Sequence, residues 1–326
     1  MYNKIISSLK FRYCHFLKHY YPYIWVKRLY KAEMGKKVNF SHPKDINEKI
    51  LWLSFFTDTS LWTTLADKYA VREYVKERIG EEYLVPLLGK WDKAEDIDFS
   101  RLPDKFVIKP NNGCYDCCIV KDKNSTDLEA IRQRMRQALL HRFGYESAEM
   151  HYTRIKPCII AEELLESKEK SGLVDYKIWC FNGEPHNILV CSNRDYITHH
   201  SNLISYDLNW NKRTANLTHS FQNKAMVEKP ENLQVLLNIA SKLSQGLPQA
   251  RIDLYNINGK IYFGEITLTS NYGMMPYYTQ SVLDDMGAHC TLPKRSVAER
   301  INTFCNRWFP KFKKDGYKLL DNNSSL

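Results

Sequence analysis

The sequence has no long uninterrupted apolar run. A membrane-spanning helix needs about 18 or more consecutive apolar residues, and no such stretch occurs among the 326 residues. The N-terminal stretch also lacks the apolar core of a signal peptide, because Lys10, Arg12, Lys18 and His19 interrupt it. We therefore expect no membrane-spanning segment and no export, and a cytoplasmic location for the protein.

The sequence also lacks internal repeats, low-complexity tracts and a disulfide framework. Its 9 cysteines are odd in number and scattered, which favours reduced thiols in a cytoplasm. Cys114, Cys117 and Cys118 lie close together, but a structural zinc site normally needs four ligands. No second C-x-x-C group or closely spaced His pair accompanies them, so we do not expect zinc there.

Recognisable nucleic-acid-binding motifs are absent, although the chain is basic. The 47 Lys and Arg residues outnumber the 37 Asp and Glu residues, which gives a formal net charge of +10. Such a charge attracts anions, among them nucleotides, acidic glycans and anionic lipids. The basic residues are dispersed rather than held in one block, and we expect no nucleic-acid partner.

What is present is the composition of a globular protein with two or three structural units. Hydrophobic residues make up 44% of the chain and charged residues 26%, enough for a sizeable core. We divide the chain into an N-terminal basic aromatic helical segment (1–40), an N-terminal subdomain (41–104), a phosphate-lid subdomain (105–165), a C-terminal subdomain with a metal-binding hairpin (166–290) and a basic tail (291–326).

The N-terminal segment combines aromatic with basic residues, such as Phe16, Trp25, Lys27 and Arg28. A helix of this composition can lie on an anionic membrane surface, at the inner face of the cytoplasmic membrane. It can equally pack on the body of the protein. The sequence leaves both alternatives open.

Periodicity and turn residues predict the remaining elements. We expect one helix that begins near residues 45–47 and three more over residues 61–79, 127–143 and 230–245. After Pro276 we expect a helical, basic tail. We expect strands at 83–88, 105–109, 117–121, 156–165, 175–181 and 185–192, and a long polar loop over residues 194–224.

A predicted β-hairpin carries the first candidate site. Strands at 251–255 and 260–267 flank an Asn-Gly pair, which is the strongest short-range hairpin signal. The two-residue period places Arg251 beside Asp253 on one strand and Glu265 beside Thr267 on the other. Two carboxylates on facing strands can hold Mg²⁺ together with the phosphates of a nucleotide. A surface hairpin with solvated charges is the alternative.

A second candidate site follows the strand that ends at Lys109. The chain continues into the Asn111-Asn112-Gly113 loop and then into another strand. Such a loop can place backbone N–H groups over phosphates while the lysine supplies positive charge. With one glycine, the loop taken alone is a weak motif.

Taken in order, these features resemble the ATP-grasp superfamily, and several blocks closely resemble its TupA-like branch, which acts in teichuronopeptide biosynthesis. The resemblance covers roughly residues 40–285. The blocks that carry it are HPKDINEK, LADKYAVREYV, FVIKPNNG, IIAEELLE, DYKIWCFNGEP and RIDLYNINGKIYFGEIT.

The resemblance implies an α+β ATP-grasp fold with the nucleotide sandwiched between two α+β subdomains, and the cofactors ATP and Mg²⁺. It implies a phosphate lid over residues 111–118 and catalytic roles for Arg251, which faces an acyl phosphate, and for Lys109 and Lys177. Lys68, Lys109 and, less securely, Lys177 would contact phosphates; Asn111, Asn112 and Gly113 would bind them from the lid; Glu162, Glu163 and Leu165 would meet adenine; and Asp253, Glu265 and Thr267 would hold the metal.

Two positions depart from the pattern of the family. Many ATP-grasp enzymes have Asn as a third metal ligand two residues after the Glu, whereas this chain has Thr267. The lid, which is often rich in glycine, contains Asp116 between cysteines. An acid beside phosphates opposes binding. Both departures leave open an altered or weakened nucleotide site.

The resemblance implies an ATP-dependent ligase that forms an amide through an acyl phosphate. Its substrates would be a carboxylate and an amine, such as a uronic acid or similar component of a bacterial surface polysaccharide and an amino acid. The alternatives are a sugar or small-molecule kinase, and a non-catalytic ATP-binding partner in a glycan assembly complex.

Overall fold

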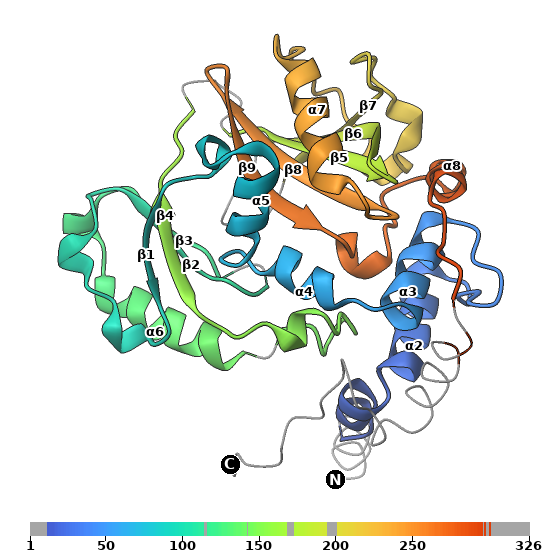
Figure 1. The fold of residues 1–326 in the computed structure, drawn as a ribbon, viewed down its shortest axis with the longest axis horizontal. Coiled ribbons are helices and arrows are strands. Elements are labelled where there is room, and N and C mark those ends of the chain that lie inside the picture. The colour runs from blue at the N-terminus through green and yellow to red at the C-terminus, as the bar shows by residue number, and fades with distance from the viewer. Residues whose placement is uncertain are drawn as a thin grey trace.

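The strands in the described part of the chain form two antiparallel sheets (Figure 1). The structure is a computed structural model and describes residues 12–113, 116–141, 143–167, 173–193, 201–295, 297 and 300. One sheet has four strands in the order β1-β4-β2-β3, and the other has five in the order β7-β6-β5-β8-β9. Helices accompany both sheets, and there are two separate clusters of buried apolar residues. The architecture is α+β, as the sequence predicts.

The smaller sheet presents Lys109 on the face opposite its core. Along β2, Phe106 and Ile108 are buried against α6, while Val107 and Lys109 alternate onto the other face. Helix α6 contributes Ile131 to the same core. The elements are β1 (Leu87–Trp91), β2 (Phe106–Pro110), β3 (Cys118–Val120), α6 (Leu128–Leu140) and β4 (Ile159–Glu163).

Strand β1 begins later than predicted. Residues 81–83 form a turn of 3₁₀ helix, and sheet pairing starts only at Leu87. Pro86 has no N–H to donate and contributes its carbonyl to the N–H of Glu163, 3.1 Å away. Because β1 pairs with β4 in the smaller sheet, we propose that the lid subdomain begins just before β1 rather than at residue 105.

The larger sheet is covered on one face by α7, whose Leu236, Ala240 and Leu243 are fully buried. Strand β7 was not predicted, because its residues lie within the expected loop over 194–224. It forms because the edge of β6 is free to pair, with Ile204 opposite Val190. The elements are β5 (Asp175–Phe181), β6 (Glu184–Ser192), β7 (Asn202–Tyr206), α7 (Leu233–Ser244), β8 (Ala250–Ile257) and β9 (Lys260–Thr267).

The prediction of one continuous helix over residues 61–79 is wrong. The segment forms two helices, α4 (Ser60–Ala66) and α5 (Val71–Ile79). At the break, the Asp67 carboxylate accepts hydrogen bonds from the backbone N–H groups of Tyr69 and Ala70 at 2.8 and 3.1 Å. The chain turns there so that Asp67 and Lys68 can bind the loop after β2.

Helix α5 connects the two sheets, between which it lies with α4 (Figure 1). Arg72 forms an ion pair with Glu162 of the smaller sheet. The hydroxyl of Tyr74 donates to the carbonyl of Leu243 in α7, 2.8 Å away. One short helix therefore helps to fix the position of one sheet relative to the other.

The N-terminal helices pack on the body of the protein. Residues 12–20 are helical, and α2 (Pro22–Met34) buries Val26 and Tyr30 completely. Helix α3 (Ile46–Phe56) begins as predicted, with Asp45 capping its first turn, and packs against α8 (Gln280–His289). Residues 1–11 and 301–326, and with them most of the predicted basic tail, lie outside the described residues.

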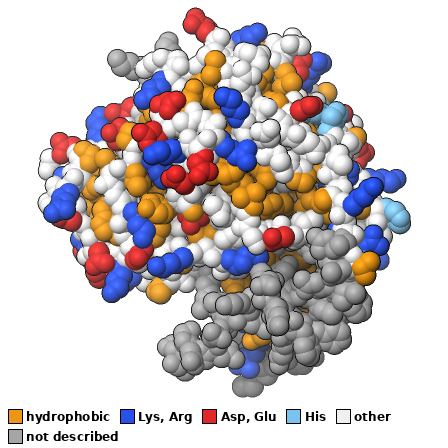
Figure 2. Space-filling view, viewed as in Figure 1, with side chains coloured by type: hydrophobic (Ala, Val, Ile, Leu, Met, Phe, Trp, Pro, Cys, Tyr) orange, Lys and Arg blue, Asp and Glu red, His pale blue; other side chains and the backbone are white. Residues whose placement is uncertain are grey.

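None of the helices among the described residues is long and apolar enough to cross a membrane. On the face in view in Figure 2, acidic and basic side chains are interspersed, and apolar side chains gather near the middle. The surplus of positive charge therefore does not form a single continuous patch on this face.

Candidate active site

The predicted hairpin of β8 and β9 is confirmed. Asn258 and Gly259 form its turn with φ of 51° and 82°, the left-handed backbone that such a turn requires. Asp253 lies opposite Glu265, and Arg251 lies opposite Thr267. The sequence therefore places these four side chains correctly relative to one another.

Asp253 is a buried carboxylate held by two cations. The Nε and Nη2 atoms of Arg251 lie 2.7 Å from its two oxygens, and the Lys177 amine donates to Oδ2. Burial favours the neutral acid, but Arg251 and Lys177 outweigh it and lower the pKa of Asp253. The carboxylate is therefore ionised at neutral pH, and two positive charges surround it.

Glu265 and Thr267 extend this cluster towards solvent. Nη2 of Arg251 lies 3.3 Å from Oε1 of Glu265 and 3.0 Å from the Thr267 hydroxyl, which donates to Glu265 over 3.1 Å. The Glu265 side chain is 47% exposed. Two carboxylates and a hydroxyl on one face of a hairpin are oxygen donors of the kind that Mg²⁺ prefers. The residues present therefore fit a magnesium ion.

Lys177 brings a third carboxylate to the cluster. On β5 it lies opposite Asp253, and its amine is 3.5 Å from the buried carboxylate of Asp175. Burial favours a neutral amine, but the two aspartates outweigh it and raise the pKa of Lys177. Lys177 is therefore a permanently charged member of the site.

Lys109 and Glu162 lie on the smaller sheet and face this cluster. The Lys109 amine is 2.6 Å from Oε2 of Glu162, and Nη1 of Arg72 is 2.9 Å from Oε1. Burial opposes the charge of Lys109, but Glu162 and, to a smaller extent, Glu265 raise its pKa. Because Glu265 belongs to the larger sheet, charges on the two sheets influence each other.

The loop after β2 is held by Asn111, whose polar groups all have partners. Its amide nitrogen donates to Asp67 and to the carbonyl of Lys156, and its side-chain oxygen accepts from the N–H of Cys158. Its backbone carbonyl accepts from the N–H of Lys68 at 2.9 Å. Asn111 therefore positions the loop through both N–H donors of its side chain, while its side-chain oxygen keeps one lone pair. Its contact with phosphate stays a prediction.

The next two residues of the loop, Asn112 and Gly113, differ from Asn111 in their contacts. The side-chain oxygen of Asn112 is buried and has no hydrogen-bond partner among the residues that the structure describes. The Lys68 amine donates to the carbonyl of Gly113. Gly113 has φ of 83°, and a Cβ atom there would lie 2.7 Å from the ring of Phe143. The loop is therefore tightly packed, with one unsatisfied polar atom beside Gly113.

The predicted adenine-contact residues lie where the chain leaves the smaller sheet. Glu163 is the last residue of β4 and has an exposed side chain, and Leu165 is half-buried in the irregular segment that follows. The side chain of Glu162, by contrast, is occupied by Lys109 and Arg72. The contacts of Glu163 and Leu165 with adenine stay a prediction.

Three residues of the site were not predicted. Arg72 binds Glu162, as described above. Nη1 of Arg251 donates to the Ser270 hydroxyl, which lies 3.2 Å from the hydroxyl of Tyr277. Arg72 lies in the LADKYAVREYV block that carries the family resemblance, and this block is the signal that could have suggested it. Ser270 and Tyr277 gave no such signal, because they lie in the 3₁₀ turn and the loop that follow the hairpin.

Glu149 connects the segment before β4 to the chain that follows β9. Its two carboxylate oxygens accept hydrogen bonds from Ser147 and Thr269, and Thr269 precedes the arginine-bound Ser270. Burial raises the pKa of Glu149 to about 7, although both hydrogen bonds oppose the rise. A carboxyl group whose pKa is raised by burial thus binds Thr269, the residue next to Ser270 of the active-site cluster.

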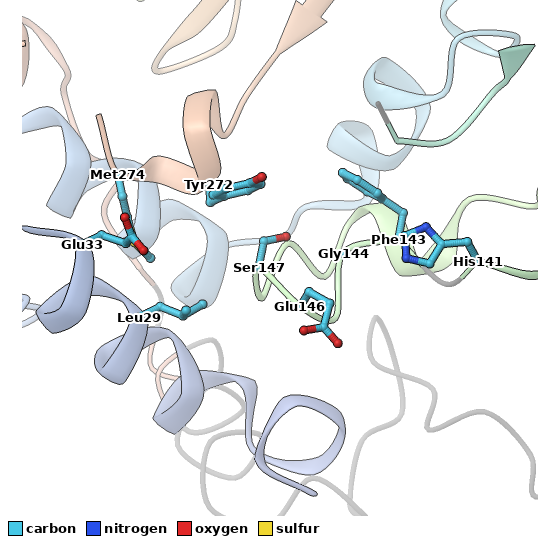
Figure 3. A pocket seen from close by; sticks show the side chains of 9 residues that line it. All are labelled: Leu29, Glu33, His141, Phe143, Gly144, Glu146, Ser147, Tyr272 and Met274. Carbon is cyan, nitrogen blue, oxygen red and sulfur yellow. The ribbon is translucent and has the colours of Figure 1, made fainter. Parts of the chain in front are cut away.

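A pocket of about 220 Å³ opens beside this connection. Its walls come from α2, from the segment over residues 141–147 and from the 3₁₀ turn η8 (Ser270–Gly273) with Met274 (Figure 3). Most of the lining is apolar, and carboxylates lie at its edge. The lining residues are Leu29, Glu33, His141, Phe143, Gly144, Glu146, Ser147, Tyr272 and Met274.

Comparison with known proteins identifies a family. The model of the family described as TupA-like ATP-grasp matches residues 48–288. No curated protein matches the chain.

Solved structures with a similar fold include a D-alanine–D-alanine ligase from Bacillus anthracis complexed with ATP, at 15% identity and a TM-score of 0.37. An L-amino acid ligase from Bacillus licheniformis has 14% identity and a TM-score of 0.44. The ADP complex of PurK, an N5-carboxyaminoimidazole ribonucleotide synthetase, has 14% identity and a TM-score of 0.42. The matches cover 69%, 76% and 76% of this chain and 65%, 55% and 58% of those chains.

Proposed function

Because the chain belongs to the TupA-like ATP-grasp family, we propose that it is an ATP-dependent carboxylate–amine ligase that acts through an acyl phosphate. The observations that carry the proposal are the cluster of Arg251, Lys177, Asp253 and Glu265 on the larger sheet and the Lys109–Glu162 ion pair on the smaller sheet. Phosphoryl transfer depends mainly on positioning and on neutralising charge. This cluster offers both cations and oxygen ligands in one place.

The nucleotide would bind between the two sheets. We assign the phosphates to Lys109, to Lys68 and to the loop at Asn112 and Gly113, and the adenine to the connection after β4 at Glu163 and Leu165. Lys109 would exchange its bond to Glu162 for a bond to phosphate. Glu162 would then keep its ion pair with Arg72, so that no carboxylate is left buried without a partner.

Asp253, Glu265 and Thr267 would hold Mg²⁺, which neutralises phosphate charge when it is bound. Asp253 already has partners on both oxygens, so Arg251 and Lys177 would have to shift as the site loads. Arg251 would then be free to turn towards an acyl phosphate. The Ser270 hydroxyl, which lies 3.2 Å from the hydroxyl of Tyr277, would remain the partner of Nη1 while the other guanidinium nitrogens turn.

The reaction has two balanced steps. An oxygen of the substrate carboxylate attacks the terminal phosphorus of ATP, and ADP leaves. The amine then attacks the carbonyl carbon of the acyl phosphate and loses a proton, an amide bond forms and inorganic phosphate leaves. Arg251 would stabilise the charge that develops on the acyl phosphate oxygens.

We place the amine substrate at the pocket of Figure 3. Leu29, Phe143 and Met274 would contact an apolar group, and Glu33 would attract an ammonium group. An amino acid with an apolar side chain meets both requirements. The carboxylate substrate would be a uronic acid or a similar component of a bacterial surface polysaccharide, which the net charge of +10 favours.

Trapping with hydroxylamine tests the reaction. The protein is incubated with ATP, Mg²⁺, hydroxylamine and a panel of uronic-acid-containing sugars, and hydroxamate and ADP are measured together. We expect hydroxamate that depends on one acid and is absent in Glu265→Gln. A stable phosphorylated sugar without hydroxamate would instead identify a kinase. ATP binding without turnover on any acceptor would identify a non-catalytic partner of a glycan assembly complex.

A further inference from the structure

A second cluster of ionisable residues lies between β6 and α8 and includes no residue of the active site. His186, Asp285 and His289 each offer one ligand atom, and these atoms lie within 4.8 Å of one another. Nε2 of His186 is 3.2 Å from Oδ2 of Asp285. In a tetrahedral zinc site with bonds of about 2.0–2.1 Å, neighbouring ligand atoms are separated by about 3.3 Å. This pair therefore already has the spacing of two zinc ligands.

Both imidazole rings have hydrogen bonds that leave one nitrogen for a metal. Nδ1 of His289 lies 2.9 Å from the backbone carbonyl of Asp285. Nδ1 of His186 lies 3.4 Å from the side-chain oxygen of Asn187. The backbone carbonyl can only accept, so it favours a proton on Nδ1 of His289 and leaves Nε2 of that ring with its lone pair. A metal ion would displace any proton on Nε2 of His186, which faces the Asp285 carboxylate. Such bonds on the second nitrogen are how proteins orient histidine ligands.

The cluster is supported by rigid elements. Asp285 and His289 are four residues apart on α8 and therefore share one face of the helix. His186 comes from β6, and the rings of His186 and His289 are 4.3 Å apart. The buried ring of Phe181 contacts both histidines. One side of the cluster is thus closed by an apolar ring, while Asp285 and His289 remain accessible from solvent.

We propose that His186, Asp285 and His289 form a binding site for Zn²⁺, with water as the fourth ligand. Two imidazoles and a carboxylate are ligands that suit zinc. The ion would join the last turn of α8 to β6. The Lys49 amine already holds that turn through the carbonyls of Gly287 and Cys290. Bound zinc would therefore stabilise the fold without taking part in ligation.

Equilibrium dialysis of the full chain against Zn²⁺, followed by metal analysis, tests the site. We expect one bound zinc per chain, at least tenfold weaker binding in His186→Ala and in His289→Gln, and no change in the exposed control His219→Ala. Zinc should also raise the melting temperature of the wild type but not that of His289→Gln. His289 is half-exposed, so its variant keeps the fold if His186→Ala does not.

Co²⁺ provides a second probe, because a thiolate ligand adds a charge-transfer band that imidazole and carboxylate ligands do not. We expect visible absorption of four-coordinate Co²⁺ without the thiolate band, and its loss in His186→Ala/His289→Gln. The proposal is overturned if the wild type binds no zinc, if the double variant binds it equally well, or if the thiolate band shows that cysteines are the ligands. Each of these results is independent of whether the protein is a ligase.

Discussion

At the residue scale, the hairpin distinguishes one buried carboxylate from one that is half-exposed. Asp253 is 2% exposed and balances the charges of Arg251 and Lys177, whereas 47% of the Glu265 side chain is exposed. Breaking a buried ion pair by removing one partner is costly, and an exposed pair contributes little. The two proposed carboxylate ligands, Asp253 and Glu265, should therefore respond differently to substitution.

Glu265→Gln should abolish ATP turnover and leave stability unchanged, because it removes a metal ligand that the fold does not need. Asp253→Asn should abolish turnover as well, and it should also lower stability by about 1–3 kcal/mol. The variant removes the charge that Arg251 and Lys177 share and leaves them the more distant carboxylates of Glu265 and Asp175. ADP release and thermal melting measure the two effects. Glu231→Gln, at an exposed position, is the control. Full turnover in both hairpin variants would rule out the metal site.

Lys109→Ala should weaken ATP binding by about 1.5–3 kcal/mol, the range for a lost charge-assisted hydrogen bond. Glu162 keeps Arg72 as a partner in this variant, so the fold should persist. Titration calorimetry measures the dissociation constant. Lys105→Ala removes a lysine whose partner is the exposed Glu166 and serves as the control. Equal dissociation constants in the two variants would place Lys109 outside the site.

Glu149 should make stability depend on pH in a predictable direction. Burial raises its pKa to about 7 in the folded state, from about 4.5 in an unfolded chain. The folded state thus binds the proton more tightly, and stability from this group is complete below pH 4.5 and lost as the pH rises towards 7. Glu149→Gln should therefore be more stable than the wild type at pH 8, by about 3 kcal/mol, and similar at pH 4.5.

Urea unfolding of both proteins across this pH range checks the prediction. Glu146→Gln, in the same segment but with an exposed carboxylate, is the control. Comparing variant with wild type cancels other groups, among them His151, whose pKa is lowered to about 3 by burial. A stability difference between Glu149→Gln and the wild type that does not vary with pH would contradict the assignment.

At the scale of elements, the break between α4 and α5 and the loop after β2 form one unit. Asp67 ends the first helix and also accepts the side-chain N–H of Asn111, and Asn111 in turn binds the chain before β4. The break between α4 and α5 therefore places Asp67 where it can bind the loop after β2. These hydrogen bonds fix the positions of Lys68 and Gly113, which we propose as phosphate contacts.

Asn111→Ala should destabilise the protein by about 2–4 kcal/mol, because it leaves several buried groups without partners. It should also weaken ATP binding, since the loop loses its anchor. Urea unfolding and nucleotide titration measure the two effects. Asn124→Ala, at an exposed turn, is the control. A variant with unchanged ATP affinity would show that the position of the loop does not matter for the nucleotide.

At the scale of the whole molecule, two sheets with separate cores face each other across the site, with α5 between them. A nucleotide that contacts both sheets should stabilise them together. ATP with Mg²⁺ at about 100 times its dissociation constant should add about 2.7 kcal/mol and raise the melting temperature by several degrees. Adenosine, which lacks phosphates, should have a much smaller effect. An unchanged melting temperature at saturating ATP would contradict binding between the sheets.

The features that the sequence by itself determined are local. The hairpin follows from an Asn-Gly turn between two alternating strands, and its register then fixes Asp253 opposite Glu265. Helix α7 follows from its apolar face, and α3 from its Asp45 cap. In each case the residues that determine the element are close together in the sequence, so their spacing is enough to predict it.

The tertiary structure decided what depends on distant partners. The break at Asp67 is stabilised by Asn111, 44 residues away, and Glu162 is bound by Arg72 across 90 residues. Strand β7 exists because an edge of β6 is free to pair with it. Such contacts form only after elements pack together, and burial then sets which charges must pair. No local sequence pattern specifies these contacts, because the free energy that stabilises them comes from the packing of elements that are far apart in the sequence.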